Sequence, residues 1–81
     1  MFVYHSDRFV NQYLDAPENV RKAYDKQQGF LVKNIRHPSL RAKKYDESRG
    51  IWQARVTLGW HFYFSIKNDT YLLHEICRHP K

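Results

Sequence analysis

The chain has 81 residues, of which 42% are apolar and 16% aromatic, and carries a formal net charge of +6. A chain of this length can build one hydrophobic core, and this composition excludes a disordered protein. Cys77 is the single cysteine, which excludes an internal disulfide framework and fits a reducing cytoplasm, and no apolar run predicts a membrane span. We therefore expect one cytoplasmic domain over residues 1–81.

The positive charge is concentrated in the second part of the chain. Residues 1–25 hold three Lys/Arg and four Asp/Glu, whereas residues 26–81 hold eleven Lys/Arg and four Asp/Glu. No acidic residue lies between Asp25 and Asp46. Such an uneven basic charge is typical of a surface that binds nucleic-acid phosphates. The alternative is an ordinary basic face in contact with solvent.

The first part of the chain predicts one strand and two helices. Residues 2–5 are apolar and β-prone, which predicts a first strand that joins the C-terminal sheet. Ser6 can cap a short amphipathic helix that ends before Pro17. A second helical stripe runs from Pro17 toward Arg36, and Pro38 prevents its continuation. We expect the two helices to form a hairpin that packs on one face of the sheet.

Residues 37–50 form a connection longer than compact domains usually contain, and long connections are often functional. Leu40 is predicted to anchor this segment in the core. Arg41, Lys43 and Lys44 are predicted to contact phosphates. The alternative is a loop that wraps the edge of the sheet with solvated charges.

Residues 50–79 predict a three-stranded antiparallel meander. In residues 60–67, apolar and polar side chains alternate, which indicates a strand with one buried face. In the preceding strand Arg55 falls on the polar face, where we expect His61 and Tyr63 as its neighbours. The third strand alternates poorly, which predicts a β-bulge or burial on both faces.

These elements predict an α+β fold in the order β-α-α-β-β-β. A two-helix hairpin would pack on a mainly antiparallel four-stranded sheet. Five histidines raise the possibility of a metal site, but their spacing does not match that of a zinc site with Cys77, so no metal ligand is predicted.

Four stretches carry a more specific pattern: residues 37–44 (HPSLRAKK), 51–57 (IWQARVT), 60–64 (WHFYF) and 77–79 (CRH). In this order they resemble the toxins of bacterial RelE/ParE-type toxin–antitoxin pairs, and the YoeB-like branch in particular. The resemblance implies a RelE-like fold and a messenger-RNA endoribonuclease that acts on the ribosome. It also implies that the enzyme needs no metal or cofactor and that a cognate antitoxin holds it inactive.

The resemblance also implies the residues of a catalytic site. Arg55 matches the arginine expected to hold the scissile phosphate. Arg78 and His79 match the basic residue and the histidine at the end of the last strand, where the general acid is expected. His61 stands where the family commonly has an arginine, and Pro38-Ser39-Leu40 offers no counterpart of the carboxylate that serves the branch as a base. Our hypothesis is that His61 acts as a base or contacts the phosphate.

The residue types suit RNA cleavage by the 2′-hydroxyl. That reaction needs a base, an acid for the leaving 5′-oxygen and cations near the nonbridging oxygens. The basic residues Arg41, Lys43 and Lys44 match the stretch that other members use on RNA. Tyr63 is expected either to stack on an unpaired base or to pack under the long connection.

Two other classes of function remain open. One is a gyrase-poisoning toxin of the ParE type, and the other is a non-catalytic RNA-binding module, including an inactive toxin. The residues also have structural alternatives: Arg55 as a surface arginine opposite Glu75, and His61 as a half-buried hydrogen-bonding ring.

Overall fold

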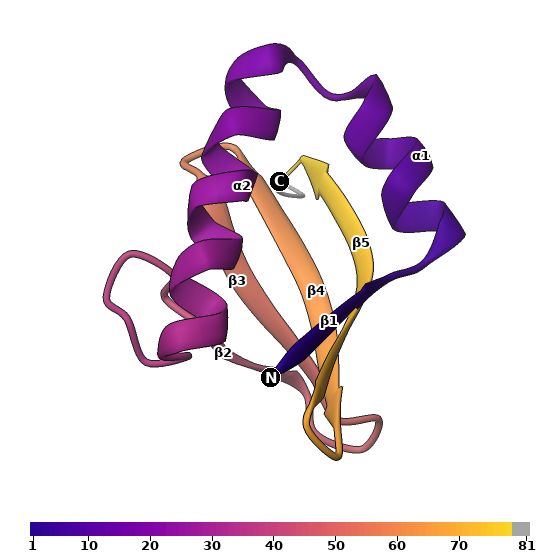
Figure 1. Cartoon of the computed structure of the whole chain (residues 1–81), viewed down its shortest axis with the longest axis vertical. Helices are drawn as coiled ribbons and strands as arrows, with labels where there is room; N and C mark the ends of the chain where they lie inside the picture. The colour runs from indigo at the N-terminus through magenta and orange to yellow at the C-terminus, as the bar shows by residue number, and fades with distance from the viewer. Residues whose placement is uncertain (79–81) are drawn as a thin grey trace.

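The computed structural model describes residues 1–78, which form two helices and a five-stranded sheet (Figure 1). The strands are β1 (Phe2–His5), β2 (Lys43–Asp46), β3 (Ile51–Thr57), β4 (Trp60–Lys67) and β5 (Thr70–Arg78). The helices are α1 (Asp7–Asp15) and α2 (Glu18–Lys33). The α+β class predicted from the sequence is confirmed. Neither helix in this part of the chain is long and apolar enough to cross a membrane.

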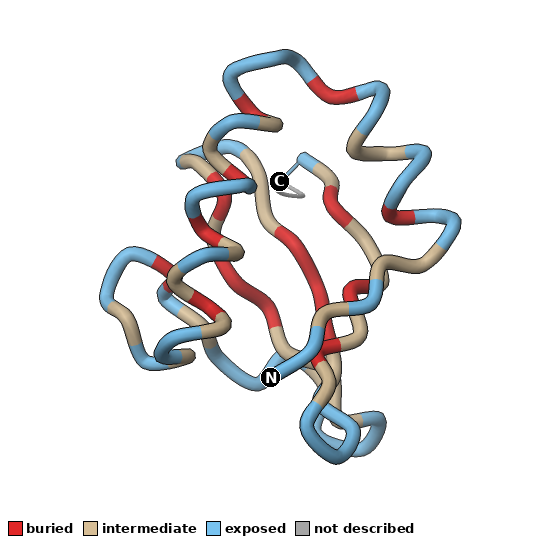
Figure 2. The backbone as a smooth tube through the Cα atoms, viewed as in Figure 1, coloured by how far each residue is buried: buried red, intermediate tan, exposed pale blue. Residues whose placement is uncertain are grey.

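The strands lie in the order β1-β5-β4-β3-β2, with β1 parallel to β5 and every other pair antiparallel. Both helices lie on the same side of this sheet (Figure 1). The buried residues follow the middle of β3, β4 and β5 and the facing sides of the helices (Figure 2). The largest fully buried side chains are Tyr24, Phe9, Phe62, Phe64, Leu31, Leu40, Leu73 and Ile76.

The prediction of four strands was wrong by one, because β2 lies within the segment read as a connection. Lys43, Lys44 and Tyr45 are all exposed, so β2 has no buried face that would produce a hydrophobic alternation. The strand pairs only with β3, as an edge strand. Exposed charged residues are usual on edge strands, which explains why the pattern suggested a loop.

The two helices begin as predicted, and the second ends earlier. The Ser6 hydroxyl accepts a hydrogen bond from the Phe9 amide at 3.0 Å and donates one to the His74 carbonyl at 3.0 Å. Helix α2 ends at Lys33 rather than near Arg36, because Asn34 is extended and starts a turn. The α1 cap therefore ties the helix start directly to β5.

The irregular pattern of β5 is explained by a β-bulge. Tyr63 pairs with Glu75 and Phe64 pairs with Leu73, so His74 is an extra residue on β5. The extra residue shifts the alternation, and Leu73 and Ile76 consequently face the same core although they are three positions apart. The sequence-based expectation of a bulge is confirmed, and the shift also places Glu75 on the face opposite the core.

Leu40 anchors the connection as predicted, with no exposed surface. Its carbonyl accepts a 2.7 Å hydrogen bond from the Arg55 amide. Gln27 lies next to this anchor, is 4% exposed, and donates from its amide nitrogen to the carbonyls of Ser39 (2.9 Å) and Arg55 (2.8 Å). Its amide oxygen accepts from the Ser39 hydroxyl at 2.8 Å. Gln27 thus joins α2, the connection and β3.

Candidate active site on the open face of the sheet

The candidate site lies on the face of the sheet opposite the helices. Cross-strand partners share a face, so the register defines two rows of side chains there. One row contains Arg55 on β3, His61 on β4 and Cys77 on β5. The adjacent row is made of Lys43, Gln53, Tyr63 and Glu75. The rows bring together side chains from four strands that are scattered over 35 positions in the sequence.

Arg55 and His61 are direct cross-strand partners, as the sequence predicted. Both side chains are half-buried, and the backbone of Arg55 is fixed by hydrogen bonds on both of its polar groups. Within residues 1–78, the buried Nε of Arg55 has no hydrogen-bond partner. The planar guanidinium of an arginine suits the geometry of phosphate oxygens. Glu75, the alternative neighbour of Arg55, instead pairs in register with Tyr63.

A groove of about 720 Å³ crosses this open face. It extends from the β2–β3 end of the sheet to the start of α1. The cations on its walls are Arg8, Arg49 and Arg78, and its one carboxylate among the described residues is Glu75. The remaining lining residues are Ser6, Tyr45, Ile51, Tyr63, His74 and Cys77. The groove therefore combines positive charge with aromatic side chains, which suits a single-stranded nucleic acid.

Tyr63 lies within the floor of the groove rather than on its rim. It is 8% exposed, and its hydroxyl accepts a 3.0 Å hydrogen bond from the amide of Gln53. Tyr45 meets the Tyr63 ring edge-to-face at 5.0 Å and is itself 56% exposed. Of these two rings, Tyr45 is the accessible one. Sequence reasoning missed it because β2 was not recognised.

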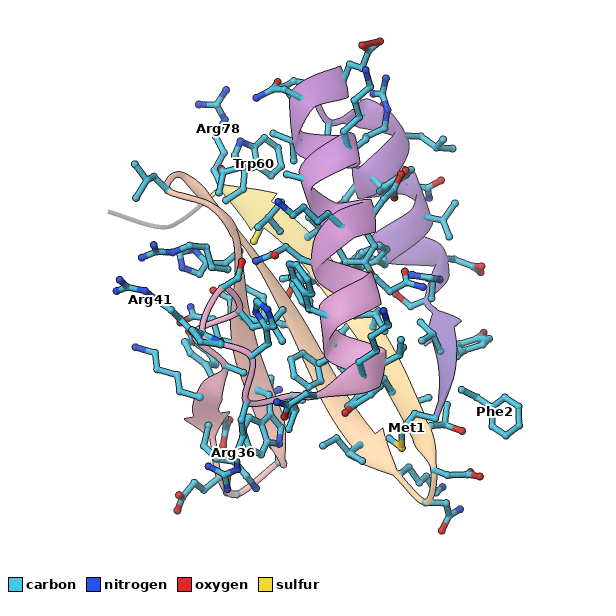
Figure 3. The ribbon with its side chains drawn as sticks, turned by 60° about the vertical axis from the view of Figure 1, so that its left-hand side comes forward. Met1, Phe2, Arg36, Arg41, Trp60 and Arg78 are labelled. Carbon is cyan, nitrogen blue, oxygen red and sulfur yellow. The ribbon has the colours of Figure 1, made fainter. Side chains whose placement is uncertain are left out.

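The two residues predicted at the end of the last strand have different outcomes. Arg78 is exposed, and its guanidinium carbon lies 5.7 Å from the centre of the Trp60 ring. Figure 3 shows the two side chains next to each other. It stands at the end of the sheet, next to the row of Arg55 and His61 but turned toward Trp60. His79 lies outside the described residues.

The basic residues of the connection separate onto different sides. Lys43 pairs with Gln53 and so belongs to the open face, whereas the ammonium of Lys44 lies 5.3 Å from the ring centre of Trp52, on the helix side. Arg41 points away from the helices (Figure 3). With Arg55 it lines a second hollow, of about 490 Å³. That hollow is also lined by Ala23, Lys26 and Gln27 of α2, so Arg41 lies near Arg55 beside the helix, and only Lys43 of the three lies on the open face.

Glu75 and Arg8 were missed as site residues. The Arg8 guanidinium lies 3.6 Å from the Glu75 carboxylate at the edge of the groove. The sequence suggested Glu75 only as a neighbour opposite Arg55, and the bulge at His74 pairs it with Tyr63 instead. Arg8 comes from α1, and no local pattern in the sequence connects it with β5.

Cys77 has no signs of a reactive thiol. Burial, and next the nearby Glu75 carboxylate, raise the pKa of the Cys77 thiol. Burial likewise raises the pKa of the Tyr63 hydroxyl. Both groups therefore hold their protons near neutral pH. In residues 1–78 no group of three His, Cys, Asp or Glu side chains is placed to hold a metal ion.

No protein-family model and no curated protein matches the sequence. Solved structures do match the fold. A YoeB/ParE toxin from Agrobacterium tumefaciens superposes with a TM-score of 0.83 at 9% identity, covering 99% of this chain and 100% of that one. YafQ from E. coli strain BL21(DE3) gives 0.78 at 12% identity, over 95% and 91% of the two chains. RelE in the RelB–RelE antitoxin–toxin complex from Methanococcus jannaschii gives 0.74 at 16% identity, over 91% and 87%.

These matches extend over nearly the full length of both chains, so they concern the whole domain rather than a shared substructure. At such low identities they establish architecture and not activity. The chain has the fold of the RelE/ParE toxins, in the form shared by YoeB, YafQ and RelE.

Proposed function

We propose that the protein is the toxin of a toxin–antitoxin pair and cleaves messenger RNA on the ribosome without a metal ion. The observation that carries this proposal is the pairing of Arg55 with His61 on the open face of a toxin fold. A cation and an imidazole stand side by side there, and the groove with basic walls lies beside them, lined by Cys77, the strand partner of His61.

The chemistry assigns a role to each member of the pair. In RNA cleavage the 2′-oxygen attacks the phosphorus and the 5′-oxygen leaves, so negative charge grows on the nonbridging oxygens. Arg55 would bind these oxygens through its planar guanidinium, whose Nε has no hydrogen-bond partner among the described residues. His61 would transfer a proton, because an imidazole changes charge near neutral pH. His79 remains a predicted general acid.

The groove supports binding of a single strand. The exposed ring of Tyr45 in the groove would stack on a base, while Lys43 on the open face and Arg41 in the second hollow would contact backbone phosphates. Lys44 would contribute less, since it lies over Trp52 on the other side of β2. The ribosome would present the strand and supply the further contacts that a domain of 81 residues cannot make alone.

The proposed protein partner is an antitoxin, as in the RelB–RelE complex that shares the fold. The chain carries a net charge of +6, which favours a partner segment rich in Asp and Glu. It also exposes large apolar side chains on β1 and α1, namely Phe2, Tyr4, Val10 and Leu14. A segment that folds on this surface would bury them while neutralising the basic charge.

The test is cleavage of a defined messenger RNA on purified translating ribosomes, with the cut sites mapped by primer extension. We expect codon-phased cuts by the wild type. Arg55→Ala should lower the cleavage rate about 100-fold or more, because one charge-stabilising donor typically contributes that much. Lys67→Ala removes one positive charge from an exposed position at the far end of β4 and should cleave normally.

Two outcomes would contradict the proposal. Salt-sensitive RNA binding by a folded wild-type protein without any cut would indicate a non-catalytic RNA-binding module. Inhibition of DNA gyrase supercoiling, with intact messenger RNA, would indicate a toxin of the gyrase-poisoning class.

A further inference from the structure

We propose that Glu75 is the general base that removes the proton from the attacking 2′-hydroxyl. This inference rests on the function proposed above. It assigns the role of general base, for which the sequence analysis found no carboxylate. Glu75 projects from β5 onto the open face because of the bulge at His74. It is the one carboxylate among the described residues that line the 720 Å³ groove.

The position of Glu75 suits a base that acts on the same phosphodiester as Arg55 and His61. Glu75 pairs with Tyr63, and His61 pairs with Cys77, so Glu75 and His61 are diagonal neighbours on one face of adjacent strands. Diagonal neighbours lie about 7–8 Å apart between backbones. Two side chains at that spacing can reach a phosphodiester from either side, and Arg55 adjoins His61 on the third strand.

The other groups in the groove are poorly suited to accept the proton. The Cys77 thiol and the Tyr63 hydroxyl are kept protonated by burial. His74 already shares a 2.8 Å hydrogen bond between its Nε2 and the Ser65 hydroxyl. The arginines are permanently charged and accept no proton. Glu75 remains, with about one third of its side chain exposed and its carboxylate 3.6 Å from Arg8.

Arg8 is a positioning residue in this arrangement. Its guanidinium lies on the α1 side of the groove and holds the carboxylate at the groove edge. Since α1 is capped by Ser6, which also bonds the backbone of His74, the helix start and the bulge form one unit. The contacts that fix the start of α1 therefore also fix Arg8 and Glu75, the two partners of this ion pair.

The reaction balances with these residues. The Glu75 carboxylate takes the 2′-hydroxyl proton as the 2′-oxygen bonds to phosphorus. The bond between phosphorus and the 5′-oxygen breaks, and the leaving oxygen takes a proton from the imidazolium of His61. In this scheme His61 acts as the acid rather than the base, in the role that the resemblance implies for His79. The products are a 2′,3′-cyclic phosphate and a 5′-hydroxyl end. Proton exchange with water then restores the carboxylate and the imidazolium.

The experiment compares single-turnover cleavage on programmed ribosomes by the wild type, Glu75→Gln, Glu75→Asp and the control Glu47→Gln. Glu47 is exposed in the β2–β3 turn, outside the groove, so its variant removes the same charge elsewhere. We expect Glu75→Gln to slow cleavage about 100-fold or more, a typical contribution of a general base. Glu75→Asp should retain part of the rate, and Glu47→Gln should match the wild type.

Two further measurements separate a base from a structural residue. Glu75→Gln should bind the ribosome-held RNA at least as tightly as the wild type, because it lacks a carboxylate that repels phosphate. It should also lose the acid limb of the pH–rate profile. The other charged and titratable groups that face Glu75 are present in both proteins: Arg8, Tyr63, His74, Cys77 and Arg78 in the groove, and His61 on β4. Rapid cleavage by a folded Glu75→Gln would overturn this inference alone. Absence of cleavage by the wild type would overturn the proposed function with it.

Discussion

The side-chain amide of Gln27 donates a 2.8 Å hydrogen bond to the backbone carbonyl of Arg55. This hydrogen bond from a buried glutamine on α2 fixes the position of β3 relative to the helix. It therefore also fixes the position of Arg55, the candidate phosphate-binding residue. Gln27 itself is buried, and its three hydrogen bonds are partly shielded from water.

Gln27→Ala should lower the free energy of unfolding by about 2–3 kcal/mol, since it removes three hydrogen bonds made by a buried amide, each contributing about 1 kcal/mol. Urea denaturation followed by circular dichroism measures this change. Asn19→Ala, at an exposed position of the same helix, should change stability by no more than about 0.5 kcal/mol. Equal stabilities of the two variants would show that Gln27 does not join the three elements as described.

Asp46 should titrate well below other surface carboxylates. Hydrogen bonds from the Ser48 hydroxyl, and next from the Arg49 guanidinium, lower the pKa of Asp46 from 3.8 to about 2. A pKa lowered by folding contributes stability above pH 3.8 that is lost as the pH falls toward 2. NMR titration of the side-chain carboxyl should give the low value in the wild type and a higher one in Ser48→Ala. An unchanged pKa in that variant would assign the effect to Arg49.

Lys43 and Lys44 should contribute unequally to RNA binding although they are neighbours in sequence. Lys43 shares the open face with Gln53, whereas Lys44 lies over Trp52. Lys43→Ala should therefore weaken binding to a single-stranded RNA and reduce the slope of log K against log salt by about 1. Lys44→Ala is the matched control and should leave the slope nearly unchanged. Fluorescence anisotropy at several salt concentrations measures both, and equal effects would contradict the assignment of faces.

Tyr45 should provide a stacking surface for a base. It is exposed on the edge strand β2 and rests against the buried Tyr63 ring, which limits its motion. Tyr45→Ala should weaken single-strand binding by about 1–3 kcal/mol, the usual contribution of one stacked base. Tyr45→Phe keeps the ring and should bind like the wild type. Loss of binding in both variants would indicate that the hydroxyl, and not the ring, contacts the RNA.

The sequence predicted the parts of the fold that have a strong hydrophobic period. Strand β4, with buried Phe62 and Phe64, and the stripe of α2 through Tyr24 and Leu31 both bury one face, and burial is what produces a regular pattern. Strand β2 has no such face, so it was read as a loop. The bulge in β5 was anticipated because the alternation of apolar and polar residues changes phase within this strand.

The candidate site was only partly predictable. Arg55 and His61 lie on adjacent strands joined by a short turn, so their pairing follows from local alternation. Glu75 was considered only as a neighbour opposite Arg55, because the residue inserted at His74 breaks the alternation that would relate β5 to the neighbouring strand. Arg8 was missed because its neighbour in space is 67 positions away. Contacts of that kind depend on how helices and strands pack, which a periodic pattern does not encode.

The parallel pairing of β1 with β5 limits how far the protein can fold during its synthesis. Residues 2–5 are made first, yet their partners are residues 70–73, so the nascent chain must keep an apolar β-prone segment unpaired for most of its synthesis. Strand β1 cannot join the sheet until residues 70–73 have been translated. A domain proposed to attack messenger RNA on ribosomes thus stays incomplete while most of its own message is being read.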